Sequence, residues 1–329
     1  MSDADKLAVI IVNWNSGAYL RQCLEALANQ SRTPDRVLVV DNASSDDSAS
    51  SLLANFPKVE FLFQKDNLGF AAGNNLAVSM ASDCRWVAFL NPDAFPEPDW
   101  LEALLRAAAD HPECSSFGSR MRMHGTTDLL DGTGDVYHIS GMAWRRDHGV
   151  AESATDRQAG EIFSPCAAAA LFSREAFLEA GGFDVSYFCY FEDVDLGFRL
   201  RLAGRQSYYV KDAIVSHVGS GTTARDSDFA VYHGARNLVW TYVKNMPGYL
   251  FWVYLPQHLA ANIAALVWYS LRGQTGTIIK AKCDALAGLP RIWKERQVQA
   301  KLRKISMSEL RRMLKKGWVL PYSKAKRGV

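Results

Sequence analysis

The feature that most constrains this chain is a regular alternation of two hydrophobic periods in its N-terminal part. Short apolar, β-branched runs predict buried strands, and the segments between them, with helical spacing of apolar residues, predict helices. The predicted strands cover residues 7–12, 36–40, 59–63 and 86–90, and the predicted helices cover 19–29, 47–55 and 71–81. This order predicts an α/β fold in which helices cover both faces of a mostly parallel sheet.

Polar clusters follow three of the predicted strands. Asn13 and Asn15 follow the first strand, the run 41–47 follows the second, and the run 91–93 follows the fourth. In an open parallel sheet, ligands bind beyond the carboxyl ends of the strands. We therefore expect the three clusters to converge on one crevice.

The middle of the chain is less regular. Residues 120–163 are rich in Gly, Asp, His and Arg and predict loops and short strands over the crevice. The small-residue run 166–172 predicts a further strand, and a helix is expected to begin after Ser173 and to end at two glycines, 181 and 182. Residues 192–202 predict another helix.

The composition is that of an ordinary globular protein, since 48% of the 329 residues are hydrophobic and 22% are charged. The first apolar run has no basic segment before it and no small-residue cleavage site after it. It therefore predicts a core strand and no signal peptide. The six cysteines are scattered without a CxxC pair, which favours reduced thiols in a cytosolic protein.

The net charge of +2 conceals a division of charge along the chain. Residues 280–329 contain 15 basic and 3 acidic residues, which leaves 22 basic and 32 acidic residues in 1–279. A basic tail suits either nucleic acid or an anionic lipid surface. Nucleic acid is the weaker interpretation, because no stacking or RNA-binding motif accompanies these charges.

The segment 249–271 favours the lipid surface. It is long enough to span a bilayer, but Pro256, Gln257, His258 and Asn262 lie in its middle, where polar side chains are costly. Its aromatic residues gather at both ends, as in a helix that lies at an interface. Residues 289–320 then form a basic amphipathic pattern. We expect peripheral membrane binding, with a buried helical core or a true span as the alternatives.

Two strand ends carry carboxylates suited to a nucleotide. Asp41 can accept hydrogen bonds from a base or ribose, although the run DNASSDD also satisfies an Asx-turn and a helix cap by itself. Asp93, in the tripeptide Asn91-Pro92-Asp93, can bind Mg²⁺ or Mn²⁺ together with substrate phosphates. The alternative for Asp93 is a simple loop carboxylate.

The run Glu192-Asp193-Val194-Asp195 places three carboxylates at the start of a predicted helix. Acidic residues there are favoured by the helix dipole, so capping is the plain interpretation. Helical spacing puts Glu192 and Asp195 on one face and points Asp193 elsewhere. One of these carboxylates could therefore face the crevice as a general base.

Other polar residues are weaker candidates. His217 could be a metal ligand or a structural histidine, and the Gly/Ser/Thr run 219–223 after it could lie against phosphates. Arg236 could reach a phosphate or form a surface ion pair. The following group could grip an acceptor or form a solvated loop: His138, Trp144, Arg145, Arg146 and His148.

Taken in order, these segments resemble a known family. The matching pieces are VIIVNWN, VLVVDNASSDDS, NLGFAAGNN, FLNPDA, GGFDVSYFCYFEDVDLGFRLRLAG and HVGSGTT. They are similar to the inverting glycosyltransferases of family 2, which have the GT-A fold, and more narrowly to the bacterial rhamnosyltransferase and galactofuranosyltransferase-like branch. The resemblance implies a GT-A domain over 1–245, followed by a basic helical region, 246–329, that associates with membranes.

The resemblance also implies roles for single residues. Asp193 corresponds to the general base, with Glu192 as the second candidate. Asp93 stands at the last position of the family's DxD metal motif, where Asn91 replaces the first carboxylate, and His217 is the expected second ligand. The nucleotide-sugar pocket would be formed by Asn13, Asn15, Asp41, Asn67, Gly69, Asn74, Asn91 and Asp93. Acceptor or phosphate contacts would come from Trp144, Arg145, Ser220 and Arg236.

The implied reaction is a single displacement that uses Mg²⁺ or Mn²⁺ and inverts the anomeric carbon. The expected donor is dTDP-L-rhamnose, with a UDP-hexose or UDP-galactofuranose as the alternative. The expected acceptor is a saccharide on polyprenyl diphosphate at the cytoplasmic face of the membrane, in the synthesis of a cell-surface glycan such as O-antigen. A nucleotidyltransferase is disfavoured, because NWNSGAYL is not a glycine-rich phosphate loop. A catalytically silent saccharide-binding protein is the alternative from another class.

Overall fold

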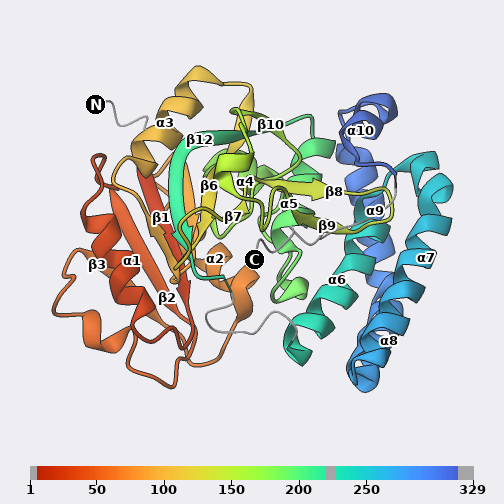
Figure 1. Cartoon of the computed structure of the whole chain (residues 1–329), viewed down its shortest axis with the longest axis horizontal. Coiled ribbons are helices and arrows are strands. Elements are labelled where there is room, and N and C mark those ends of the chain that lie inside the picture. Colours follow the sequence, from red (N-terminus) through yellow and green to blue (C-terminus); the bar gives the residue numbers. More distant parts are fainter. Residues whose placement is uncertain (1–5, 220–226, 318–329) are drawn as a thin grey trace.

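The structure is a computed structural model that describes residues 6–219 and 227–317. Within these residues, ten strands form one sheet, in which β10-β12-β6-β11-β4-β1-β2-β3 lie side by side, β5 pairs with β12 and β7 with β6 (Figure 1). The strands are β1 Leu7–Asn13, β2 Arg36–Asp41, β3 Val59–Phe63, β4 Trp86–Leu90, β5 Ala94–Pro96, β6 Cys114–Met123, β7 Leu130–Gly132, β10 Gly160–Ile162, β11 Ala169–Ser173 and β12 Gln206–His217. A separate hairpin is formed by β8 Asp135–Tyr137 and β9 Ala143–Arg145.

The predicted parallel sheet is confirmed. Strand β1 pairs in parallel with β2 on one side and with β4 on the other, and β2 pairs in parallel with β3. Strand β11 joins this group antiparallel to β4 and β6. The fold is therefore mixed α/β with a mostly parallel centre.

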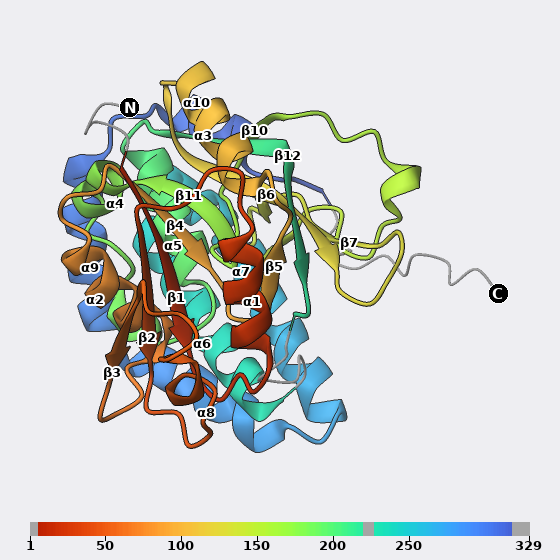
Figure 2. The same ribbon diagram turned by 90° about the vertical axis from the view of Figure 1, so that its left-hand side faces the viewer.

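Helices cover both faces of the sheet. They are α1 Tyr19–Ala28, α2 Gly69–Met80, α3 Trp100–Asp110, α4 Arg174–Glu179 and α5 Glu192–Leu202. Leu7, Val9 and Ile11 of β1 pack with α1 and α3, whereas Ala8 and Ile10 pack with α2, α4 and α5. Figure 2 shows α1 and α2 on opposite sides of β1 and β2. Successive strand residues point to opposite faces, so this double burial explains why the strands are continuously apolar.

The helix predicted over 47–55 is wrong. The structure has only a 3-10 turn there, η2 Ser50–Leu52. Side chains of the preceding segment bond to nearby groups: Ser48 donates through its hydroxyl to Asp46 Oδ1 over 2.6 Å, and its amide bonds the same oxygen over 3.2 Å. Such local side-chain bonds compete with helix formation.

The irregular middle is only partly as expected. Residues 120–163 are mostly loops, with the short strands β7 to β10 and the turn η3 Glu152–Ala154 between them, as expected. However, β6 runs through residues 114–123 in the centre of the sheet, between β11 and β12. The strand predicted over 166–172 begins later, at Ala169, and the helix after Ser173 is confirmed, since the Ser173 hydroxyl accepts a hydrogen bond from the Ala176 amide.

The C-terminal part is helical and lies at the right of Figure 1. Its helices are α6 Asp228–Asn245, α7 Gly248–Leu271, α8 Thr275–Ala287, α9 Leu289–Leu302 and α10 Met307–Met313. The basic amphipathic pattern of 289–320 is two helices, and residues 318–320 lie outside the described residues. Its apolar residues Ile292, Ile305, Leu310 and Leu314 are buried in a core shared with α5, α6 and α7. These side chains therefore stabilise the protein interior.

Candidate active site

A crevice of about 590 Å³ opens where β1 and β4 end, between the hairpin β8–β9 and the start of α5. This volume is typical of small-molecule and cofactor sites. The sequence-predicted site residues that line it are Asn67, Gly69, Asn91, Asp93, Trp144, Arg145, Glu192, Asp193 and His217. The expected convergence is thus observed for the metal and base candidates.

The strand-end residues Asn13 and Asp41 lie behind the lining of the crevice. Both are buried, and the Asn13 amide donates to Asp41 Oδ1 over 2.7 Å. The Ser44 hydroxyl donates to the same Asp41 oxygen over 2.7 Å, and Asn15 Oδ1 accepts a hydrogen bond from the Ser45 amide over 2.7 Å. The polar turn expected for DNASSDD is therefore present. Trp14, which lies between Asn13 and Asn15 in the sequence, lines the crevice.

The segment 67–75 organises a second side of the crevice. Asn67 Oδ1 accepts a hydrogen bond from the Gly69 amide over 2.8 Å, and Gly69 has a φ of 79° that suits glycine. A Cβ at Gly69 would lie 2.6 Å from the Phe188 ring. Asn74 lies outside the lining, because its buried amide donates to the Phe70 carbonyl over 2.9 Å.

Strand pairing brings Asp93 and His217 together. In the antiparallel pairing of β5 and β12, Ala94 lies opposite His217, so Asp93 lies beside the imidazole. Asp93 Oδ1 is 3.4 Å from His217 Nε2, and the Asn91 amide nitrogen is also 3.4 Å from Nε2. Both Asp93 and His217 are buried.

Asp131 orients this histidine from behind. Its Oδ2 atom is 2.7 Å from His217 Nδ1, and it also pairs with Arg145 and lies 3.2 Å from His148. Burial would lower the pKa of His217, but hydrogen bonds to Asp131 and Asp93 raise it above the usual value. Burial would raise the pKa of Asp131, but the Arg145 charge and hydrogen bonds from His148 and His217 hold it well below its usual range.

These residues fit a divalent cation as a two-ligand site. Because Nδ1 of His217 bonds Asp131, Nε2 is the ring nitrogen that faces Asp93. Loss of the Nε2 proton to solvent would free its lone pair for a cation, with Asp131 holding the ring as in many metal sites. No group of three or more His, Cys, Asp or Glu side chains with metal-binding geometry occurs within residues 6–219 and 227–317. A cation bound by Asp93 and His217 would therefore take its other ligands from substrate phosphates and water, as is common for Mg²⁺.

The three carboxylates at the start of α5 lie in two different environments. Glu192 and Asp193 line the crevice, whereas Asp195 is fully buried and pairs with Arg199 over 2.8 Å. The Asp193 carboxylate accepts a hydrogen bond from the Ala167 amide over 3.2 Å, which fixes its orientation. Glu192 Oε2 has no hydrogen-bond partner among the described residues. Burial, and then the charges of Asp193 and Asp195, raise the pKa of Glu192 well above its usual value.

Asp135 is a crevice residue that the sequence did not indicate. Its amide donates to the Ser164 carbonyl over 2.8 Å, and Ser164 packs on Gly197, one turn of α5 beyond Asp193. Burial and the charge of Asp193 raise the pKa of Asp135 well above its usual value. Two carboxyl groups thus face the same part of the crevice.

The acceptor candidates separate in the structure. Trp144, Arg145 and His148 line the crevice. His138 instead bonds Ser140, and Arg146 donates to Thr133. The predicted contact Ser220 lies outside the described residues.

Arg236 also lies outside the crevice lining. Its Nη2 atom donates to the carbonyl oxygens of Ser186 over 3.1 Å and Tyr187 over 3.0 Å. Its guanidinium group lies over the Trp240 ring, 4.4 Å from the centroid. The observed contacts of Arg236 are therefore with a loop of the protein itself.

A mostly parallel sheet with helices on both faces, and with a crevice at its strand ends lined by carboxylates and a histidine, is typical of glycosyltransferases with a GT-A-like fold. The family model described as "Glycosyl transferase family 2" matches residues 8–181. The chain belongs to this family.

Similar proteins and solved structures agree with this family and fold. The chain is 31% identical over 254 residues to an N-acetylglucosaminyl-diphospho-decaprenol L-rhamnosyltransferase of Mycobacterium tuberculosis, which covers 70% of this chain and 82% of the relative. A crystal structure of GalNAc-T7 with UDP, GalNAc and Mn²⁺ matches with a TM-score of 0.61 and 14% identity, over 76% of this chain and 49% of that one. The mannosyltransferase PcManGT of Pyrobaculum calidifontis, in complex with GDP-Man and Mn²⁺, matches with a TM-score of 0.53 and 18% identity, over 90% and 84%.

Proposed function

We propose that this glycosyltransferase transfers L-rhamnose from dTDP-L-rhamnose, with inversion, to a saccharide carried on a polyprenyl diphosphate. One observation carries the catalytic part of the proposal: Asp193 and the Asp93–His217 pair line the same crevice. The donor and acceptor are inferred from the similarity to the mycobacterial rhamnosyltransferase. Synthesis of a cell-surface polysaccharide such as O-antigen is the corresponding role.

Asp193 is the proposed general base. The Ala167 amide donates to Asp193 Oδ2 over 3.2 Å and the Val194 amide donates to Oδ1 over 2.8 Å, which orients the carboxylate. A carboxylate oxygen can accept more than one hydrogen bond, so a remaining lone pair can take the proton of an acceptor hydroxyl. The hydroxyl oxygen then attacks the anomeric carbon from the face opposite the diphosphate, and a single attack of this kind inverts the configuration. Glu192 is the weaker candidate, because its raised pKa favours the protonated form.

The nucleotide diphosphate is proposed to lie on the opposite side, near Asp93 and His217. A divalent cation, Mg²⁺ or Mn²⁺, held by these two residues would stabilise the negative charge of the departing diphosphate. Structural neighbours with the same fold were crystallised with Mn²⁺. The remaining donor contacts are proposed to come from Asn67, Gly69 and Asn91, which line the crevice. Asn13, Asn15, Asp41 and Asn74 lie outside its lining and would act by holding the strand-end turns and the start of α2 in place.

The acceptor saccharide is proposed to contact Trp144 and Arg145, which lie in the β8–β9 hairpin beside Asp131 and His148. An indole ring offers an apolar face for a sugar ring and a guanidinium group offers hydrogen bonds. Because both residues share the crevice with Asp193, an acceptor held there would present a hydroxyl group to the base.

We further propose that the helical region 246–329 attaches the catalytic region 1–245 to the cytoplasmic face of the membrane. Among the described residues, α7 is the one helix whose length and composition would allow it to cross a membrane. At 100° per residue, its exposed large apolar side chains lie within one half of the helix circumference and form one broad stripe. They are Tyr249, Trp252, Val253, Leu259, Ile263, Val267, Trp268 and Leu271. A stripe along one face suits a helix that lies in the interface.

The polar residues in the middle of α7 support the in-plane orientation. His258 is buried and its Nδ1 atom is 2.8 Å from the Ser140 carbonyl oxygen, in the loop between β8 and β9. Asn262 Oδ1 accepts a hydrogen bond from Lys282 of α8 over 2.6 Å. These contacts tie one face of α7 to the protein and leave the stripe for lipid. Nearby Lys and Arg residues of 280–316 would each add about 1 kcal/mol of attraction to anionic headgroups.

The proposal is tested by a nucleotide-release assay over a panel of dTDP-, UDP- and GDP-sugars, with Mn²⁺, Mg²⁺ or EDTA. The expected result is release from dTDP-L-rhamnose that EDTA abolishes. Asp193→Asn and Asp93→Ala should also abolish it, while Asp147→Asn should retain it, because Asp147 does not line the crevice. Faster nucleotide release from a UDP-hexose or UDP-galactofuranose would show that the donor is that sugar nucleotide and not dTDP-L-rhamnose. If no donor releases its nucleotide, even when a lipid-linked acceptor and membranes are added, the result would favour a saccharide-binding protein that has lost the family's activity.

A further inference from the structure

The loop that leads into α5 has a strained backbone. Phe188, Tyr190 and Phe191 line the crevice, and their φ angles are 65°, 67° and 70°. Positive φ is costly for bulky side chains, and such residues persist only where their surroundings hold them. Glu192 and Asp193 follow this loop directly. The contacts that fix the loop therefore also determine how the two carboxylates are oriented in the crevice.

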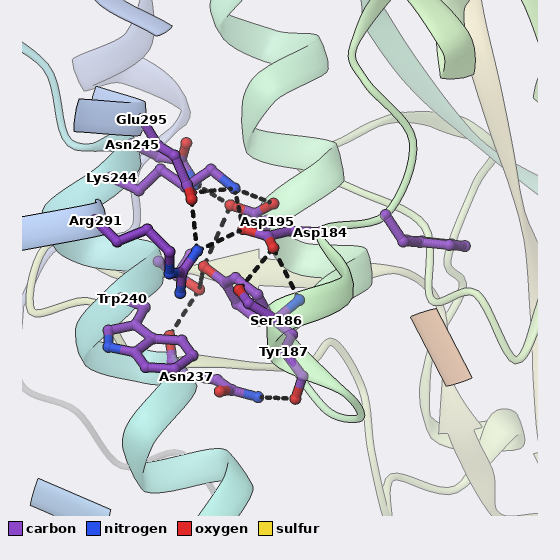
Figure 3. Close-up of polar contacts among 12 residues, drawn as sticks. Asp184, Ser186, Tyr187, Asp195, Asn237, Trp240, Lys244, Asn245, Arg291 and Glu295 are labelled. Carbon is purple, nitrogen blue, oxygen red and sulfur yellow. Dashed lines mark hydrogen bonds and ion pairs between the residues drawn. The ribbon is translucent and has the colours of Figure 1, made fainter. Parts of the chain in front are cut away.

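On one side, Asn237 of α6 holds the loop. Its side chain is fully buried, and its amide nitrogen donates to three loop carbonyl oxygens, those of Tyr187 over 3.0 Å, Cys189 over 3.0 Å and Tyr190 over 2.7 Å. Figure 3 shows Asn237 directed at Tyr187 from α6. An amide has two N–H groups, so one of them is shared between two acceptors. A single side chain therefore holds three carbonyl groups within residues 187–190.

On the other side, α2 holds the same loop. The amides of Phe70 and Ala71, at the start of α2, donate to the Phe188 carbonyl oxygen over 2.8 Å and 3.2 Å. Asn75 makes a pair of hydrogen bonds with the backbone of Phe183, over 2.7 Å and 2.9 Å. The NLGFAAGNN segment thus supports the loop and lines the crevice at once.

A buried charge cluster fixes the first turn of α5 to α6 (Figure 3). Lys244 pairs with Asp184 over 2.7 Å and with Asp195 over 3.1 Å, and the Asn245 amide donates to Asp195 Oδ1 over 2.7 Å. Burial would raise the pKa of Asp195, but the charges of Arg199 and Lys244 keep it below its usual value. The loop 184–191 is thus anchored at both ends, and Asn237 holds its middle.

We propose that Asn237 is a positioning residue for sugar transfer: it fixes residues 187–190 so that Asp193 and Glu192 face the attacking hydroxyl of the acceptor. The inference rests on the proposed function, because the base must be Asp193 or Glu192 for the loop to matter. It assigns a role to a helix that lies outside the matched family segment, which ends at residue 181. Asn237 itself does not line the crevice.

The test compares Asn237→Asp with wild type. Aspartate keeps the size of the side chain but removes both N–H donors and places carboxylate oxygens against three carbonyl oxygens. Active sites are counted by calorimetric titration with dTDP and Mn²⁺, and the transfer rate is expressed per nucleotide-binding site. Because only folded protein binds dTDP, a smaller folded fraction in a variant does not change the rate per site. We expect dTDP affinity within about twofold of wild type and a kcat per site that is lower by about tenfold or more, because small misplacements of reacting groups cost up to about 10²-fold.

Two further variants complete the test. Asn75→Ala loosens the loop from α2 and should also lower kcat per site, which keeps the proposal testable if Asn237→Asp does not fold. Asn29→Ala removes an exposed side chain after α1 that donates to the Glu25 carbonyl oxygen over 3.0 Å, and it should leave kcat per site unchanged because Asn29 bonds neither the loop nor α6.

An active wild type with equally active sites in Asn237→Asp would overturn the role of Asn237 alone. A wild type that binds dTDP and transfers nothing would overturn the proposed function, and this role with it.

Discussion

Replacing Asp131 by Asn should weaken metal binding without touching a metal ligand. Asp131 is buried, accepts the Nδ1 hydrogen of His217 over 2.7 Å, and pairs with Arg145. Asparagine has almost the same shape, but its uncharged amide no longer fixes the tautomer of the imidazole. Loss of such an outer-shell partner costs about 10–100-fold in metal affinity. This factor corresponds to about 1.4–2.7 kcal/mol.

The assay is the Mn²⁺ concentration that gives half-maximal nucleotide release, measured for wild type and Asp131→Asn. The same substitution removes one partner of a buried ion pair, which costs about 3–5 kcal/mol in stability. Asp147→Asn is the matched control, because Asp147 pairs with Arg157 over 2.9 Å in the neighbouring turn and has no contact with His217. The control should lose stability and keep its Mn²⁺ requirement. An unchanged Mn²⁺ requirement in Asp131→Asn would refute the reasoning.

Three further predictions concern other parts of the chain. Asn91→Asp restores the missing carboxylate beside His217 and should lower the half-activating Mn²⁺ concentration by about tenfold, since added ligand charge tightens hard-cation sites; a higher concentration would contradict this. Trp252→Lys with Ile263→Lys should abolish flotation with anionic vesicles and leave soluble nucleotide release unchanged, whereas retained flotation would exclude the α7 stripe. Burial lowers the pKa of His258 from 6.5 to about 4, so the unfolded chain binds the proton first and wild-type stability should fall from pH 6.5 to pH 4. The fall should be smaller in His258→Gln, as urea unfolding at each pH would reveal.

Local sequence patterns predicted the parts of the fold in which neighbouring residues decide the structure. Strands β1 to β4 are short apolar runs, and helix α5 begins at Glu192 as expected. The helix predicted over 47–55 failed because side-chain hydrogen bonds of the polar turn compete with the backbone. The amphipathic pattern after residue 289 was real, but a pattern does not say whether its apolar face meets lipid or the protein interior.

Residues of the crevice lining were predictable where chemistry and motif coincide, as for Asp93, Asp193 and His217, whose roles stay predictions. Asp131 was missed because it lies 86 residues from His217, and no spacing in the sequence links them. The contact of Asn237 with the loop was missed for a similar reason, since its three acceptors are backbone carbonyl groups 47 to 50 residues away. Supporting residues of this kind depend on tertiary contacts, which one sequence does not reveal.

The most direct test of the central claim is transfer from dTDP-L-rhamnose to N-acetylglucosaminyl-diphospho-polyprenol, with the product linkage determined by NMR. The account predicts a rhamnosyl lipid with the anomeric configuration opposite to that of the donor, formed only with Mg²⁺ or Mn²⁺ and absent with Asp193→Asn. A product with retained configuration, or one formed equally well by Asp193→Asn, would contradict the account.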